Sequence, residues 1–121
     1  MSCEIDLRVG GAWRYASEGP NGERMVQSGV YRVVDAPRLL VSTERFDDQS
    51  YEGESIVSHH LVERDGVTKL TTTVRYASRA ARDTVLRYPM ARGVGESYER
   101  LDVVLAESLA SLKERIEERN R

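Results

Sequence analysis

The chain has 121 residues, of which 40% are hydrophobic and 31% charged, and its formal net charge is −2. This length suits a single domain over residues 1–121, and the composition is typical of a globular chain, which excludes an intrinsically disordered protein. Acidic and basic residues are interspersed along the sequence, so no clustered basic surface for a nucleic acid is predicted.

The cysteine content and the N-terminus bear on where the protein works. Cys3 is the single cysteine, so no internal disulfide can form, which fits a reducing compartment. The first residues carry neither a basic start nor an apolar segment, and no apolar run approaches the roughly 18–20 residues that span a bilayer. We expect a cytoplasmic protein without a membrane span. The predominance of arginine, with Lys69 and Lys113 the only lysines, indicates a GC-rich, bacterial genome.

The N-terminal third reads as three strands. Residues 3–9 alternate apolar and charged side chains, and Gly10-Gly11 separates them from a second strand over residues 12–17. The dipeptide Asn21-Gly22 is a strong signal for a tight hairpin, which returns the chain along a third strand, residues 24–34.

Three further strands follow. A proline-containing turn at residues 35–38 leads into a strand over residues 39–46. Strands over residues 54–63 and 67–76 flank Asp65-Gly66, which marks a second tight hairpin. Six strands in sequence predict an antiparallel meander and an α+β fold, because the rest of the chain is helical.

Helical patterns occupy the C-terminal third. Ser78 is a favourable N-cap for a short helix over residues 79–86, and Pro89 interrupts the chain after it. A long helix follows over about residues 92–118. One apolar stripe runs along it at intervals of three and four residues, formed by Val94, Tyr98, Leu101, Leu105, Leu109, Leu112 and Ile116.

Alternation of side chains across each strand predicts a ligand-binding surface. A concave sheet and the long helix would enclose residues that are apolar but carry several hydroxyls and one imidazole, which suits an amphipathic ligand. The predicted ligand-binding residues are Trp13, Tyr15, Tyr31, His59, Leu61, Val74, Tyr98 and Leu101. The alternative is that these side chains simply pack the core, as aromatic residues usually do.

Two residues are candidates for catalysis. If Glu44 faces the same side as His59 on the neighbouring strand, the two could form an acid–base pair. His59 and His60 are adjacent on a strand and point to opposite faces, so they cannot chelate one metal together. No pattern of metal ligands and no glycine-rich nucleotide loop is present, so we expect neither a metal nor a cofactor.

Four ordered segments resemble a known family. Residues 3–15 are similar to its stretch D-L-R-x-G-G-x-W-R, and residues 29–41 to its G-x-Y-x-E-V followed by P-x-R-L-V. Residues 63–71 resemble E-R-D-G-x-T-x-L-T, and residues 95–101 resemble G-W-x-x-S-L-x-R-L. The family is the SRPBCC superfamily with a START-like domain, and the nearest branch is the homologues of the C-terminal domain of the heat-shock protein 90 ATPase activator.

The resemblance implies the helix-grip fold of START domains and the birch-pollen allergen. Family members begin with a strand and two short helices that have no counterpart before Cys3, so we expect an N-terminally truncated domain. Exposed strand edges and apolar surface would then favour a homodimer.

The function stays open between three classes. The first is non-enzymatic binding of an apolar or amphipathic small molecule between sheet and helix, so the protein is expected not to be an enzyme. The second is a chaperone-associated stress-response protein that uses the charged helix end at residues 113–121. The third is a cyclase or hydrolase that uses His59. Likeness of fold alone does not decide among them.

Overall fold

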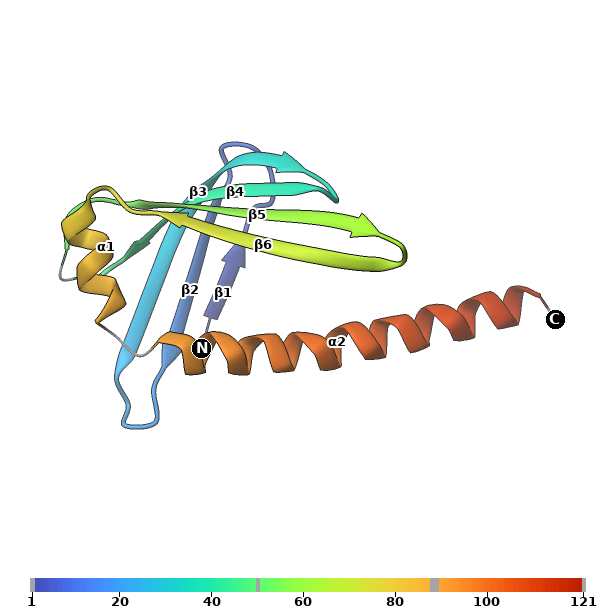
Figure 1. Cartoon of the computed structure of the whole chain (residues 1–121). Coiled ribbons are helices and arrows are strands. Elements are labelled where there is room, and N and C mark those ends of the chain that lie inside the picture. The colour runs from blue at the N-terminus through green and yellow to red at the C-terminus, as the bar shows by residue number, and fades with distance from the viewer. Residues whose placement is uncertain (1, 50, 88–89, 121) are drawn as a thin grey trace. The chain divides into compact units, whose positions relative to one another are not determined.

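The computed structural model describes residues 2–49, 51–87 and 90–120, with side chains described for all of these except residues 90–93. Six strands pair consecutively into one antiparallel sheet in the order β1 to β6, and two helices follow (Figure 1). The predicted meander is thereby confirmed. The elements are β1 (Ser2–Ile5), β2 (Ala12–Glu18), β3 (Arg24–Asp35), β4 (Leu39–Phe46), β5 (Ser55–Arg64), β6 (Val67–Arg75), α1 (Arg79–Leu86) and α2 (Met90–Arg119).

The first strand is shorter than its sequence pattern predicts, because a turn takes its second half. β1 ends at Ile5, not at residue 9. The amide of Arg8 donates to the carbonyl of Asp6 at 2.9 Å, and Gly10 has a φ of 82°, which favours glycine. The Gly10 amide then donates to the carbonyl of Tyr31 at 2.8 Å, which ties this turn to β3.

The two predicted hairpin turns form as expected. Asp65 and Gly66 both have positive φ, 54° and 79°, as the tight turn between β5 and β6 requires. Gly22 supplies a φ of 80° in the turn between β2 and β3. Between β3 and β4, the Arg38 amide donates to the Asp35 carbonyl at 2.8 Å, and the guanidinium of Arg38 pairs with the Asp35 carboxylate at 2.6 Å.

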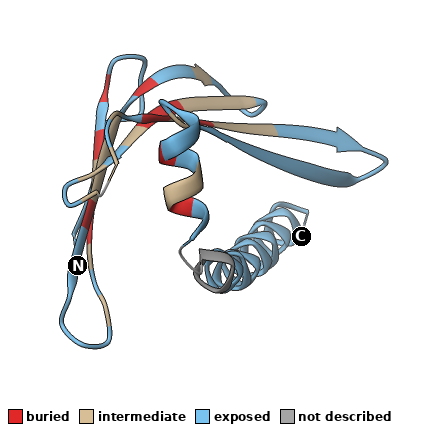
Figure 2. Ribbon diagram, turned by 60° about the vertical axis from the view of Figure 1, so that its left-hand side comes forward, coloured by how far each residue is buried: buried red, intermediate tan, exposed pale blue. Residues whose placement is uncertain are grey.

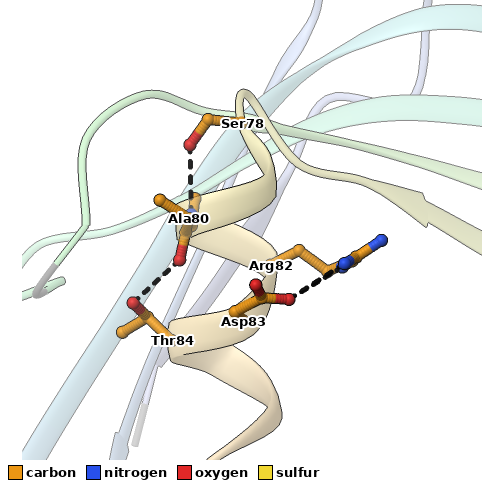
Figure 3. Close-up of polar contacts among 6 residues, drawn as sticks. Ser78, Ala80, Arg82, Asp83 and Thr84 are labelled. Atoms are coloured by element: carbon orange, nitrogen blue, oxygen red, sulfur yellow. Dashed lines mark hydrogen bonds and ion pairs between the residues drawn. The ribbon is translucent and has the colours of Figure 1, made fainter.

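The short helix α1 begins and ends where the sequence predicts. The Ser78 hydroxyl accepts a hydrogen bond from the Ala81 amide at 3.0 Å, which satisfies a donor that the first helical turn leaves free (Figure 3). Ala81 and Val85 are the buried residues of α1. Figure 2 shows α1 on the concave side of the sheet, and Figure 1 shows the strong twist of the strands from β1 to β6.

The chain divides into two compact units, residues 1–85 and 86–121. The second unit contains α2, which confirms the predicted long C-terminal helix; Pro89 lies outside the described residues. The described side chains of α2 from Val94 onward are all exposed, and the predicted apolar stripe runs along it. The buried hydrophobic residues belong to the first unit: Trp13, Ala16, Val26, Tyr31, Val57, Ala81 and Val85 (Figure 2).

Gly29 marks the closest approach within the sheet. A Cβ atom at this position would collide with the carbonyl oxygen of Thr43 on β4 and would lie 2.7 Å from the Trp13 Nε1 atom. The Val30 amide, next along β3, donates to the Thr43 hydroxyl at 2.9 Å. β2, β3 and β4 therefore meet at Gly29 with no room for a side chain.

We expect Gly29→Ala to lower the free energy of unfolding by about 1–3 kcal/mol, because backbone and indole must both move aside. Chemical denaturation followed by the fluorescence of Trp13, the single tryptophan, measures this. Gly95→Ala is the control, since open space surrounds Gly95 in α2 and alanine favours helix by about 1 kcal/mol. An unchanged denaturation midpoint for Gly29→Ala would contradict the packing described.

Candidate functional site

The register of the first three strands gathers aromatic residues on one side of the sheet. Trp13 pairs with Ile5 of β1 and with Gly29 of β3, while Tyr15 pairs with Cys3 and Gln27. Directly paired residues share a face, and so do residues two positions apart on one strand. Tyr31 therefore lies on the same side as Trp13 and Tyr15. We call this side the aromatic face and define it by these three residues.

The register of the last three strands continues the aromatic face. Tyr31 pairs with Ser42 of β4, which pairs with Val57 of β5, and Val57 pairs with Val74 of β6. His59 pairs with Thr72, and Leu61 with Leu70. The structure thus places all the sheet residues of the predicted ligand-binding set on one face: Trp13, Tyr15, Tyr31, His59, Leu61 and Val74.

Trp13 lies on β2, next to the edge strand β1. Its side chain is 5% exposed, and its ring centroid is 4.9 Å from that of Tyr15, with the planes tilted by 44°. The absence of a side chain at Gly29 allows the indole to lie over β3. The buried Nε1–H group of Trp13 has no hydrogen-bond partner among the described residues, which leaves a donor for a ligand to satisfy.

The hydroxyls of Tyr15 and Tyr31 lie close enough to affect each other. Burial raises the pKa of Tyr15, the Cys3 thiol adds to the rise, and a hydrogen bond with Tyr31 opposes it. Burial likewise raises the pKa of Tyr31, and the proximity of Tyr15 raises it further. Both phenols are therefore held in the neutral form, which can donate or accept a hydrogen bond.

Glu44 also faces this side, which the sequence left open. It lies two residues from Ser42 on β4 and pairs with Ser55 of β5. The side chain is half-buried, and burial raises the pKa of its carboxyl. Tyr76, which follows β6, interacts electrostatically with this carboxylate. Burial raises the pKa of Tyr76, and the charge of Glu44 raises it further.

The predicted acid–base pair of His59 and Glu44 does not form. His59 pairs with Leu40 while Glu44 pairs with Ser55, so the two are four residues apart along the ladder. At the rise of a strand this is about 13 Å, well beyond hydrogen-bond reach. The Nδ1 atom of His59 instead lies 3.0 Å from the Thr72 hydroxyl, and burial lowers the pKa of the imidazole.

Tyr98 and Leu101, the remaining members of the predicted set, lie on α2 in the second unit. They are three residues apart on its apolar stripe and are 44% and 42% exposed. The structure describes the two units separately, so their part in a site with the aromatic face stays a prediction.

The opposite face of the sheet carries a shallow hollow of about 410 Å³. Charged side chains from four parts of the chain line it, namely Glu4, Arg14, Arg45 and Glu54. A second open depression, of about 860 Å³, follows the loop between β4 and β5. Trp13 and Gly29 also line the first hollow, but neither depression contains Tyr15, Tyr31, His59, Leu61 or Val74.

The described residues bear on metal sites and on membrane-spanning helices, and the position of His60 concerns the first. Within residues 2–49, 51–87 and 90–120, no group of three or more His, Cys, Asp or Glu side chains could hold a metal ion. None of the helices described is long and apolar enough to cross a membrane. His60 lies on the face opposite to His59, as the alternation of side chains predicts.

The open antiparallel sheet followed by a long helix places the protein in the helix-grip class of α+β folds. The chain belongs to the family described as Activator of Hsp90 ATPase homolog 1-like protein, which matches residues 1–106. The resemblance that the four sequence segments carry is thereby confirmed.

Solved structures of bacterial proteins are similar over most of the chain. A protein from Rhodobacter sphaeroides has 33% sequence identity and a TM-score of 0.78, covering 88% of this chain and 68% of that one. Protein Ms6760 from Mycobacterium smegmatis has 28% identity and a TM-score of 0.73, covering 88% and 69%. Protein CV1439 from Chromobacterium violaceum, at 24% identity, 64% and 57% coverage and a TM-score of 0.57, shares the fold alone. Comparison with curated proteins finds no match.

We expect Glu44→Gln to stabilise the protein at neutral pH. A carboxyl whose pKa is raised on folding contributes stability below its unfolded pKa and loses it as the pH rises through the folded value. The variant should therefore melt at a higher temperature than the parent at pH 7, and the difference should shrink as the pH falls into the ordinary carboxyl range. Glu63→Gln, at an exposed position of β5, is the control and should leave the midpoint unchanged. A lower melting temperature for Glu44→Gln at pH 7 would contradict the claim that burying the Glu44 carboxylate destabilises the folded protein.

Proposed function

We propose that this protein binds a small apolar or amphipathic molecule on the aromatic face, as a binding module and not as an enzyme. The observation that carries the proposal is the gathering of Trp13, Tyr31, His59, Leu61 and further residues on one face by the register alone. Family membership supports a ligand-binding or chaperone-associated role without specifying the ligand.

The composition of this face suits an amphipathic ligand. Leu61, Leu70 and Val74 are each 38–39% exposed and offer apolar contact area. On β2 and β3, the same face carries polar groups that can orient a ligand: the buried Nε1–H of Trp13 and the Tyr15 and Tyr31 hydroxyls. Ligand sites typically combine such an apolar lining with a few convergent polar groups. That Tyr98 and Leu101 of α2 contribute to the ligand site stays a prediction, and so does a cytoplasmic location.

A titration with N-phenyl-1-naphthylamine, a neutral apolar dye, tests the proposal through quenching of the single Trp13. Leu61→Glu, on the aromatic face, should weaken binding about tenfold, because the loss of one leucine contact is worth roughly 1.5 kcal/mol. Val62→Glu, the neighbour on the opposite face and 47% exposed, is the matched control and should bind as the parent does. Absence of binding, or equal weakening by both variants, would contradict the proposal.

The family description supports a second candidate, association with a chaperone of the Hsp90 type. The predicted surface for it is the charged end of α2 at residues 113–121. Side chains there are exposed as far as they are described, so they are available to a partner. The enzyme alternative loses its main argument, since Glu44 lies about 13 Å from His59 along the ladder.

The sequence also predicts self-association, and the exposed edges of the sheet support this prediction. β1 and β6 are the two edges of the open sheet, and near the first edge Ile5, Leu7 and Val9 are 52%, 59% and 68% exposed. Exposed apolar side chains beside a strand edge favour pairing with a second copy.

We therefore expect a homodimer. Sedimentation equilibrium at micromolar concentration should give twice the mass of 13.7 kDa. Leu7→Lys with Val9→Lys should shift the equilibrium to the monomer, and Val67→Lys, 70% exposed in the hairpin of β5 and β6, should not. A well-folded parent that sediments as a monomer would contradict this prediction.

A further inference from the structure

Glu44 is unusual among the charged residues of the sheet. Its carboxylate is half-buried and makes no ion pair or hydrogen bond with any described residue. A carboxylate partly removed from water without a partner costs stability unless something else compensates it. The register places no lysine or arginine of the sheet on the aromatic face beside it; Arg45 and Arg14 point to the opposite face.

Aromatic side chains share the face of the sheet on which this carboxylate lies. Gly29 lies opposite Glu44 in the register, between the pairs Ser28–Arg45 and Tyr31–Ser42, and Trp13 pairs with Gly29 on its other side. Because Gly29 has no side chain, the indole extends over β3 towards β4 and Glu44.

Tyrosines complete the surroundings. The ring of Tyr15 packs against Trp13, with centroids 4.9 Å apart and planes tilted by 44°. Tyr76 interacts electrostatically with Glu44 from the β6 side, and its ring meets that of Tyr51 edge-on at 6.2 Å. Tyr31, 6% exposed, lies two residues beyond Gly29 on β3.

Aromatic rings around one carboxylate have a definite chemical preference. Ring faces carry negative charge density and attract cations, and the attraction is larger for alkylated ammonium groups that shed water easily. The carboxylate adds a full opposite charge in an environment of reduced polarity. An anion such as a fatty acid carboxylate would instead be repelled by Glu44.

We propose that the aromatic face binds an organic ammonium ion, with the cationic head between Glu44 and the rings of Trp13 and the tyrosines. This inference rests on the proposed function and names its ligand class: a cationic amphiphile or amine with an apolar tail along Leu61, Leu70 and Val74. The tail would run along the β5–β6 hairpin, since these residues continue the same face away from Glu44.

Three ligands with the same six-carbon tail test the proposal: hexyltrimethylammonium, hexanol and hexanoate. Isothermal titration and Trp13 quenching measure their affinities for the full chain. The ammonium ion should bind about tenfold more tightly than the alcohol, as a partly desolvated cation–aromatic and charge contact predicts, and hexanoate more weakly than the alcohol.

Variants then locate the charge that selects the ligand. Glu44→Gln should reduce the affinity for hexyltrimethylammonium about tenfold, to that of hexanol, and should leave hexanol binding unchanged. Glu63→Gln is the control, because it removes the same charge from the same face. Glu63 pairs with Thr68 and lies about 26 Å along β5 from Ser55, the partner of Glu44. It should alter neither affinity. Thermal melts of both variants verify that they fold.

Equal affinity for the ammonium ion and the alcohol, or insensitivity to Glu44→Gln, overturns the ammonium proposal. If hexanol or the dye still binds, and the dye still distinguishes Leu61→Glu from Val62→Glu, the broader binding function stands. If none of the three compounds and no apolar dye binds, both proposals are wrong.

Discussion

The pairing of β2, β3 and β4 around Gly29 is the constraint on which the rest of the sheet depends. At this point a glycine allows the Thr43 carbonyl and the Trp13 indole to approach β3 more closely than any side chain would permit. The hydroxyl of Thr43 holds the next amide of β3. Because side chains alternate with a period of two, fixing the register here fixes which residues of β2, β3 and β4 share the aromatic face. The pairings of β4 with β5 and of β5 with β6 extend that face across the sheet.

A cost in stability accompanies this arrangement. On one face the sheet holds a half-buried carboxylate, Glu44, and a buried indole N–H, and neither has a hydrogen-bond partner among the residues that the structure describes. A chain selected for stability alone would place apolar side chains at both positions. Groups that a fold leaves unsatisfied on an aromatic face are what a ligand can satisfy, so the cost and the proposed binding function have the same origin.

Much of this was predictable from sequence because it depends on local pattern. The bounds of β4 and α1, the turn at Asp65-Gly66 and the shared face of Trp13 and Tyr15 follow from alternation, capping and turn chemistry. The predicted length of β1 was wrong. The turn that ends this strand at Ile5 depends on a hydrogen bond from the Gly10 amide to the Tyr31 carbonyl, which is distant in sequence. The face of Glu44 and its distance from His59 depend on how β4 pairs with β3 and β5, and no local pattern reveals that register.

Nuclear Overhauser contacts of the Glu44 side chain test the central claim most directly. The account predicts contacts from its methylene protons to the ring of Tyr76 and to the indole of Trp13. A register slipped by one residue would turn Glu44 to the other side of the sheet and give contacts to Ile56 and Val30 instead, and that result would contradict the account.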